Sequence, residues 1–347
     1  MQKRLYSFDV LKGMAIFMVV LGHVVEYGMT GGSDSVLFRF VGRMHMPLFF
    51  FISGWFSARV GSDGNLMFPS LGKRFRQLVV PMAAVSSLWV LYTPYGPELL
   101  ADSATFGELW LSSGKGGYWF NITLFEIIVL FGISMPVLNR LRPAGRVGYV
   151  FVVYGTLFLV DRFVVPGAVS DAMCLYSVCV YWVVFMFGVL ARTESSRFMR
   201  LLSDTRLMSG VFVIMALSLA ALVWRDSMSI PGPAYMAVIP LMHITLSCIA
   251  MGAVLPWCAE AEQSCRPGAV MNLWMSLGRN SLGIYLLHFF FLWPVGPLQD
   301  ALRVDASYIV PALFFAGAIA AAIIAAVMML IAVMRPAAEV KKLLTGS

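Results

Sequence analysis

The sequence predicts an all-α membrane protein, a polytopic bundle of about ten transmembrane helices with both termini in the cytoplasm. Three observations support this prediction: the composition, the length of the apolar runs and the distribution of basic residues. Of the 347 residues, 60% are hydrophobic and 12% are charged. Too few polar residues remain to cover the surface of a soluble globular protein of this size.

Ten apolar runs are the candidate spans. Most reach the roughly 20 residues that a helix needs to cross the hydrocarbon core of a bilayer. Most of the connections between them are short, apart from residues 28–43, 59–77 and 96–118. The expected spans, in chain order, are residues 8–27, 44–60, 78–95, 119–138, 147–164, 174–191, 209–224, 235–257, 274–296 and 308–334.

The basic residues predict the orientation of these spans. With the N-terminus in the cytoplasm, 17 of the 25 Lys and Arg residues fall on the cytoplasmic side and 6 on the other side. The remaining two, Lys12 and Arg279, lie within spans. This asymmetry follows the positive-inside rule and favours an even number of spans. The net charge of +7 is therefore explained by membrane topology rather than by nucleic-acid binding.

The chain is expected to form a single transmembrane domain over residues 1–335, followed by a short cytoplasmic tail, 336–347. The first apolar run contains charges and lacks a small-residue cleavage site, so we expect it to remain as a span. The five cysteines form no CxxC pair and no Cys/His ligand spacing, so the sequence predicts no metal site. Any chemistry is expected to take place between the spans.

Four polar residues share one stripe of the first span. A helix advances about 100° per residue, which places Asp9 at about +60°, His23 at about +20° and Glu26 at about −40° from Lys12. Lys12 and His23 are then about 16 Å apart along the helix axis. Charged groups in a bilayer are costly unless they face a protein interior or a water-filled cavity. The stripe therefore marks a candidate site.

The histidines extend this candidate site. His23, His45 and His288 are all expected in the outer half of the membrane, where they line a shared polar cavity or, alternatively, only pack between helices. Histidine suits a general base because its usual pKa lies near neutrality. In the ninth run, Ser281, Tyr285 and His288 follow the spacing i, i+4, i+7 and share a helix face. That face either lines a site or makes hydrogen bonds between helices.

A basic run, Lys73-Arg74-Phe75-Arg76, precedes the third span. One interpretation is a cluster that only sets the topology of the chain. The other is a phosphate-binding patch at the cytoplasmic face, because Lys and Arg make charge-assisted hydrogen bonds to phosphate.

These segments together resemble the acyltransferase family 3 membrane proteins. The similarity extends over almost the whole chain and is nearest to the branch of stand-alone sugar O-acetylases, such as fucose 4-O-acetylase-like and enterobacterial-antigen acetylases. The two most specific segments are in the first two spans, and the others support them. The matching segments are Arg4…Ser7-Phe8-Asp9-Val10-Leu11-Lys12-Gly13…Gly22-His23, Met44-His45-Met46-Pro47-Leu48-Phe49-Phe50-Phe51-Ile52-Ser53-Gly54, the basic run up to Pro81, Tyr118-Trp119-Phe120, and Asn280 to His288.

The resemblance implies transfer of an acyl group, usually acetyl from acetyl-CoA, to a hydroxyl of a cell-envelope glycan or its lipid-linked precursor. The family's basic residue followed by histidine after ten positions matches Lys12 and His23. Its basic pair matches Lys73 and Arg76, with Lys in place of the more usual Arg. Lys binds phosphate as a point charge rather than through two parallel hydrogen bonds. The resemblance implies no permanently bound cofactor, since acetyl-CoA is a substrate.

The resulting hypothesis assigns each end of the stripe a role. Acetyl-CoA enters from the cytoplasm, its pantetheine arm reaches into the bundle, and His23 deprotonates the acceptor hydroxyl. Glu26 orients the imidazole or raises its basicity, and Asp9 pairs with Lys12. His45 and Ser53 support the site. The donor-binding residues are Lys12, Lys73, Arg74 and Arg76, and the acceptor-side residues are Trp119, Ser281, Tyr285 and His288.

Two other functions fit the same stripe. A transporter can use intramembrane His, Asp and Lys residues as a proton relay, although the inverted repeats of many transporters are not evident in the sequence. A structural partner of a glycan-synthesis complex is the third hypothesis. In each case we expect a multi-pass protein of a bacterial inner membrane, in contact with the lipid bilayer, and the sequence makes no prediction of its oligomeric state.

Overall fold

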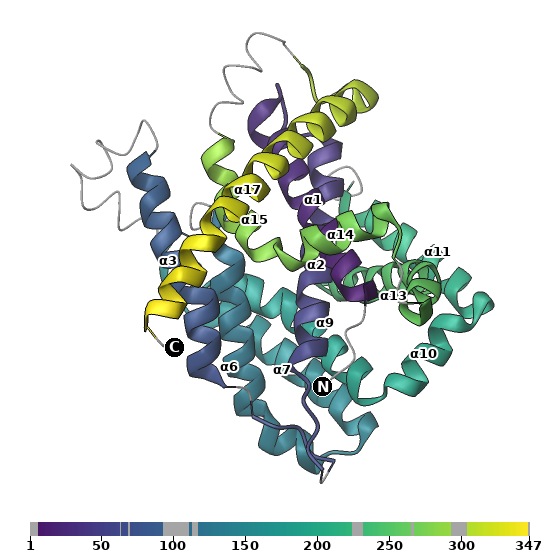
Figure 1. The fold of residues 1–347 in the computed structure, drawn as a ribbon. Coiled ribbons are helices and arrows are strands. Elements are labelled where there is room, and N and C mark those ends of the chain that lie inside the picture. The colour runs from purple at the N-terminus through teal and green to yellow at the C-terminus, as the bar shows by residue number, and fades with distance from the viewer. Residues whose placement is uncertain are drawn as a thin grey trace. The chain divides into compact units, whose positions relative to one another are not determined.

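A computed structural model describes residues 6–62, 64–68, 70–92, 111–112, 117–223, 232–264, 267–292 and 304–345 (Figure 1). Within these ranges the secondary structure is helical, apart from two isolated β-bridges, Thr30 with Asp305 and Val60 with Leu66. The predicted all-α fold is confirmed. The helices are α1 (Tyr6–Gly28), α2 (Val36–Ser57), α3 (Leu71–Tyr92), α6 (Trp119–Arg140), α7 (Pro143–Phe163), α8 (Gly167–Ala172), α9 (Leu175–Thr193), α10 (Ser195–Ser203), α11 (Thr205–Val223), α13 (Gly232–Ser264), α14 (Ala269–Arg279), α15 (Ser281–Leu287), the 3-10 helix η2 (His288–Phe291) and α17 (Ile309–Thr345).

Within the described residues, each of the ten apolar runs falls on a helix or on a series of short helices. In the described part of the chain, seven helices are long and apolar enough to cross a membrane, or eight if the bent pair α10 and α11 forms one span. The chain is therefore a multi-pass membrane protein. The total of ten spans and the location of both termini in the cytoplasm stay predictions. The predicted tail from residue 336 begins inside α17, which continues to Thr345.

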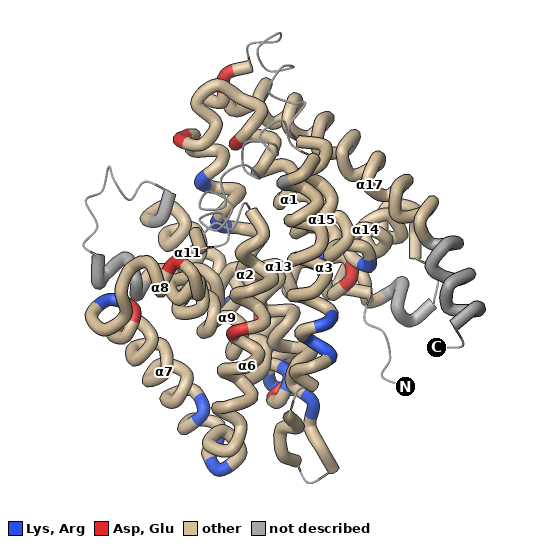
Figure 2. Tube along the Cα trace, turned by 90° about the vertical axis from the view of Figure 1, so that its left-hand side faces the viewer, with Lys and Arg blue, Asp and Glu red and all other residues tan. Residues whose placement is uncertain are grey.

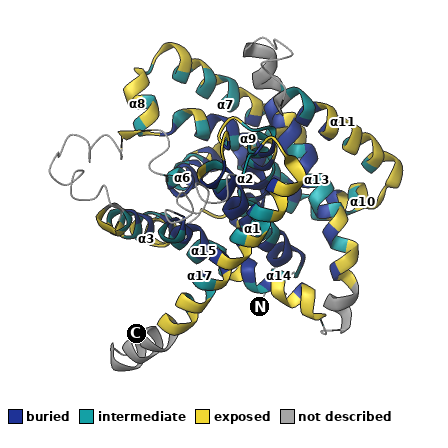
Figure 3. Ribbon diagram, turned by 90° about the horizontal axis from the view of Figure 1, so that it is seen from above, coloured by how far each residue is buried: buried dark blue, intermediate teal, exposed yellow. Residues whose placement is uncertain are grey.

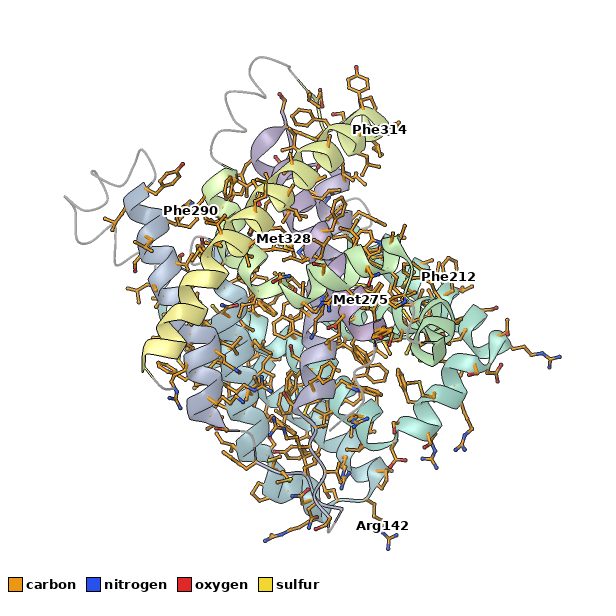
Figure 4. The ribbon with its side chains drawn as sticks, viewed as in Figure 1. Arg142, Phe212, Met275, Phe290, Phe314 and Met328 are labelled. Carbon is orange, nitrogen blue, oxygen red and sulfur yellow. The ribbon has the colours of Figure 1, made fainter. Side chains whose placement is uncertain are left out.

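Two helices carry long exposed apolar faces. Only 6% of the apolar window of α7 and 22% of that of α17 is buried, and Figure 3 shows exposed residues along both helices. Phe314 on α17 is 77% exposed, and Figure 4 shows it projecting from its helix. Exposed apolar side chains of this density are expected where a helix faces lipid.

The chain divides into two compact units. The first contains residues 1–46 and 254–347, and the second contains residues 47–253. Helices α2 and α13 each contribute residues to both units. The prediction of a single domain over residues 1–335 stays a prediction.

In the first unit, α1 packs against α14, α15 and α17. Two glycines bring the backbones of α1 and α14 together: a Cβ atom on Gly13 would clash with the carbonyl oxygen of Trp274, and one on Gly278 with that of Asp9. Small residues at such crossings are typical of membrane helix pairs. In the apolar window of α1, 72% of the residues are buried; of the polar stripe, Asp9 is buried and Lys12, His23 and Glu26 are half-buried.

The start of α2 differs from the prediction. The helix begins at Val36, eight residues before the predicted span. Ser35 accounts for this, because its hydroxyl accepts a hydrogen bond from the Phe38 N–H at 3.0 Å and donates one to the Gly32 carbonyl at 2.7 Å. Such an N-cap satisfies an N–H that has no partner within the first helical turn.

The predicted ninth span, residues 274–296, is not one helix. It is divided at Asn280 into α14 and α15, and η2 then begins at His288. The Asn280 side chain donates a hydrogen bond to the Ser276 carbonyl at 2.7 Å, and its backbone N–H is shared between the carbonyls of Ser276 and Leu277. An Asn side chain that competes for backbone carbonyls in this way ends a helix. Ser281 and Tyr285 therefore lie on α15, and His288 begins the following 3-10 turn.

In the second unit, α2 and α9 approach each other through Gly54 and Gly188. A Cβ atom on either glycine would clash with a carbonyl oxygen of the other helix, that of Phe185 or Phe51. Helix α10 is bent by 86° from α11 and packs its Phe198 ring against Phe51 and Trp55. The basic residues of α3 gather at the end where the helix begins, as Figure 2 shows.

Candidate active site

A hydrogen-bonded pair lies on the polar stripe of α1. Nδ1 of His23 is 3.0 Å from Oε2 of Glu26, one helical turn later. The two side chains are 18% and 25% exposed, so a ligand has access to them. A carboxylate only accepts hydrogen bonds, so the neutral imidazole carries its hydrogen on Nδ1. Nε2 of His23 then has a free lone pair, as a general base requires.

His288 packs against His23 in the same unit. The two rings are stacked, with centroids 5.3 Å apart, and Phe289 contacts both of them. Nδ1 of His288 donates to the carbonyls of Tyr285 at 2.7 Å and Ile284 at 3.1 Å. Its side chain is fully buried, and its Nε2 has no hydrogen-bond partner among the described residues. His288 therefore also presents an unprotonated Nε2 beside His23.

His45 is the third histidine of this cluster. Its Nδ1 donates to the Val41 carbonyl at 2.8 Å, and its ring lies beside Gly22. It also interacts electrostatically with His23. The structure thus brings His23, His45 and His288 together from α1, α2 and η2.

The remaining predicted residues of the first unit surround this cluster or lie along α1. Tyr285 contacts His288, with ring centroids 6.1 Å apart, and Ser281 is half-buried one turn earlier on α15. Asp9 is buried and Lys12 half-buried near the start of α1. Because α1 is continuous over both, the axial separation of about 16 Å between Lys12 and His23 holds. The pairing of Asp9 with Lys12 stays a prediction.

The basic run forms the first turns of α3, in the second unit. Lys73 and Arg76 are exposed and Arg74 is half-buried. Burial and the charge of Arg59 lower the pKa of Arg74 from its usual value. Arg59 was not among the predicted site residues. Glycines between Arg59 and Lys73 favour turns, and they were the only sequence signal that the chain brings Arg59 back toward α3. One of them, Gly64, has a φ of +78°.

An aromatic cluster surrounds Trp119 in the second unit. The Tyr181 ring stacks on Trp119 at 5.6 Å, on Phe50 at 4.3 Å and on His243 at 5.3 Å. Sequence reasoning singled out Trp119 but not Tyr181 or the position of His243, because nothing in their local sequence predicts a contact between α6, α9 and α13. Ser53 lies on α2 next to Gly54 and is half-buried.

A family model described as an acyltransferase domain matches residues 5–331, nearly the whole chain. The chain belongs to acyltransferase family 3. This membership confirms the resemblance seen in the sequence, and the matched range contains every candidate residue named above.

Two curated relatives of this acyltransferase family 3 chain are both named nodulation protein NolL. The protein of Mesorhizobium japonicum is 32% identical over 141 residues, which cover 39% of this chain and 37% of the relative. The protein of Sinorhizobium fredii is 34% identical over 181 residues, which cover 44% of this chain and 48% of the relative. The chain thus spans less than half the length of each of these relatives. No solved structure matches it.

Proposed function

We propose that the protein is a membrane O-acyltransferase that moves an acetyl group from acetyl-CoA to a hydroxyl of a cell-envelope glycan or lipid-linked sugar in a bacterial inner membrane. Membership of acyltransferase family 3 supports the reaction class. The observation that supports the mechanism is the hydrogen bond of 3.0 Å between His23 and Glu26 on a half-buried stripe of α1. A His-carboxylate pair of this kind activates hydroxyl groups in acyl transfer.

The reaction needs one base and one leaving group. Nε2 of His23 removes the proton of the acceptor hydroxyl while its oxygen attacks the carbonyl carbon of the thioester. The new C–O bond forms and the C–S bond breaks, and the thiolate of CoA leaves. The His23 imidazolium then returns the proton to this thiolate, so the enzyme regains its starting state. Glu26 holds Nδ1–H in place and stabilises the imidazolium while it exists.

The donor is recognised through its phosphates. Lys12, Lys73, Arg74 and Arg76 supply positive charge, which forms charge-assisted hydrogen bonds with phosphate oxygens. The axial distance of about 16 Å between Lys12 and His23 is similar to the reach of a pantetheine arm from phosphate to thioester. On the acceptor side, the half-buried Trp119 offers an aromatic face to a sugar ring.

Transfer of label from radioactive acetyl-CoA to envelope glycans tests the proposed function. Membrane vesicles that contain the protein are expected to acetylate the glycan fraction, whereas vesicles from an isogenic strain without it are not. Mass spectrometry of the glycans from both strains identifies the acetylated sugar. Equal labelling in both strains would contradict the proposal, and pH-driven solute uptake without acetyl-CoA would favour a transporter instead.

A matched pair of substitutions at His288 tests the acceptor side. Phenylalanine keeps a ring that stacks on His23 but lacks the Nε2 lone pair, whereas glutamine lacks the ring but keeps an acceptor atom. We expect His288→Phe to lower kcat/KM for the acceptor about tenfold to a hundredfold, because a buried hydroxyl of the acceptor loses its partner. His288→Gln should retain more activity. The reverse order would assign His288 to packing alone.

A further inference from the structure

Between α2 and α3, residues 58–62 and 64–67 form a small hairpin. The Met67 N–H donates to the Arg59 carbonyl at 2.8 Å, and the Gly61 N–H donates to the Asn65 carbonyl at 2.8 Å. An isolated antiparallel bridge joins Val60 and Leu66 between these two hydrogen bonds. The backbone of Arg59 is therefore held in a defined place.

Asn139, at the end of α6, fastens this hairpin. Its Oδ1 accepts a hydrogen bond from the Leu66 N–H at 2.9 Å, and its Nδ2 donates to the Leu66 carbonyl at 3.2 Å. The side chain thus substitutes for a neighbouring strand by satisfying both backbone groups of one residue. Phe68 continues the contact, since its ring lies against Gly132 on the same helix.

This arrangement gathers positive charge near the start of α3. Arg59 pairs with Met67, four residues before α3 begins at Leu71, and its charge acts on Arg74 in the first turns of that helix, where Lys73 and Arg76 are exposed. Among the described residues, none of these four side chains has an acidic partner within ion-pair distance. The beginning of α3 adds the positive end of a helix dipole. Like charges held together without a counter-ion are typical of an anion site.

We propose that Arg59 is a further cation of the phosphate site for the acyl-CoA donor, beside Lys73, Arg74 and Arg76, and that the hairpin that Asn139 fastens to α6 holds it there. The identity of the anion rests on the proposed function. Arg59 binds the phosphates directly, and Asn139 is a positioning residue that acts through the hairpin. The site therefore combines residues from α3 and from a loop that precedes it, and it selects donors that carry phosphates on the nucleotide end.

The test compares two donors that differ in their phosphates. Equilibrium binding of acetyl-CoA and of S-acetylpantetheine, which has no phosphate, is measured on the purified full-length protein. We expect Arg59→Ala to weaken acetyl-CoA binding about five- to tenfold and to leave S-acetylpantetheine binding unchanged. Arg59→Lys should restore most of the affinity. Arg197→Ala, which removes an exposed arginine of α10, is the control and should bind both donors like the wild type.

Asn139→Ala separates positioning from general damage. It is expected to weaken acetyl-CoA binding by a smaller factor than Arg59→Ala does. The double variant should bind no more weakly than Arg59→Ala, because both substitutions act on the same contact.

Equal weakening of the binding of both donors, or wild-type affinity of Arg59→Ala for acetyl-CoA, would overturn the proposal. If the wild type binds neither donor, the proposed function fails, and inorganic pyrophosphate then probes the cations alone. Weaker pyrophosphate binding by Arg59→Ala supports the anion site, and unchanged or absent binding overturns it.

Discussion

Replacing His23 by glutamine is expected to lower the rate of acetyl transfer by about 10²- to 10⁴-fold, the usual contribution of a general base. Glutamine is similar in length and polar, so it still forms a hydrogen bond with Glu26, but its amide cannot take a proton from a hydroxyl. The affinity for acetyl-CoA should stay within a factor of about two, since the donor is bound elsewhere and through other charges.

Two measurements on the same preparation check this expectation. Single-turnover transfer to the glycan reports the chemical step, and equilibrium binding of acetyl-CoA reports whether the variant is folded. His23→Ala serves as a second variant and should be equally slow. Wild-type turnover in either variant would remove His23 from the mechanism, and loss of donor binding in both would show that the residue is structural.

The polar stripe on α1 could be predicted because it depends only on local periodicity. Asp9, Lys12, His23 and Glu26 share a helix face in any continuous helix, and α1 is continuous from Tyr6 to Gly28. The hydrogen bond between His23 and Glu26 follows from their i, i+3 spacing. The apolar runs likewise predict where helices form, because a bilayer requires about 20 apolar residues for each span.

The contacts between distant segments could not be predicted in the same way. Arg59 approaches α3 because Asn139, in another helix, binds Leu66, and no local pattern links the three. Hydropathy also says little about side-chain caps. The hydroxyl of Ser35 starts α2 early, and the amide of Asn280 divides a run that hydropathy predicts as one span. In both places a single polar side chain decides where a helix begins or ends, whatever the average hydropathy of the residues around it.

The histidine cluster shows how the two kinds of information combine. Depth in the membrane, deduced from the sequence, places His23, His45 and His288 at a similar level. The structure adds the direction of each ring: Nδ1 of every one of the three is used by Glu26 or by a backbone carbonyl. Each neutral imidazole therefore directs an unprotonated Nε2 away from its own helix turn. A substrate rich in hydroxyl groups matches three such acceptors better than a substrate without donors does.

Glu26→Gln is expected to lower kcat about tenfold to a hundredfold, with little change in KM for acetyl-CoA. Glutamine has the same shape and can still accept a hydrogen bond from Nδ1–H of His23, but it lacks the negative charge that stabilises the imidazolium during transfer. The effect is smaller than that of His23→Gln because the base itself remains. The matched control is Glu194→Gln, which removes a carboxylate with the same i, i+3 spacing to Arg197, 3.9 Å away in an exposed ion pair.

Combining the substitutions distinguishes a joint role from two separate ones. If Glu26 acts only through the imidazole, the double variant His23→Gln/Glu26→Gln should be no slower than His23→Gln alone, because residues that act as a unit are not additive. A further loss in the double variant would mean that Glu26 contacts the substrate by itself. A wild-type kcat in Glu26→Gln would show that the hydrogen bond from Nδ1 of His23 to residue 26 orients the imidazole without any need for charge. The activity of His23 as a base would then require only that its hydrogen is on Nδ1.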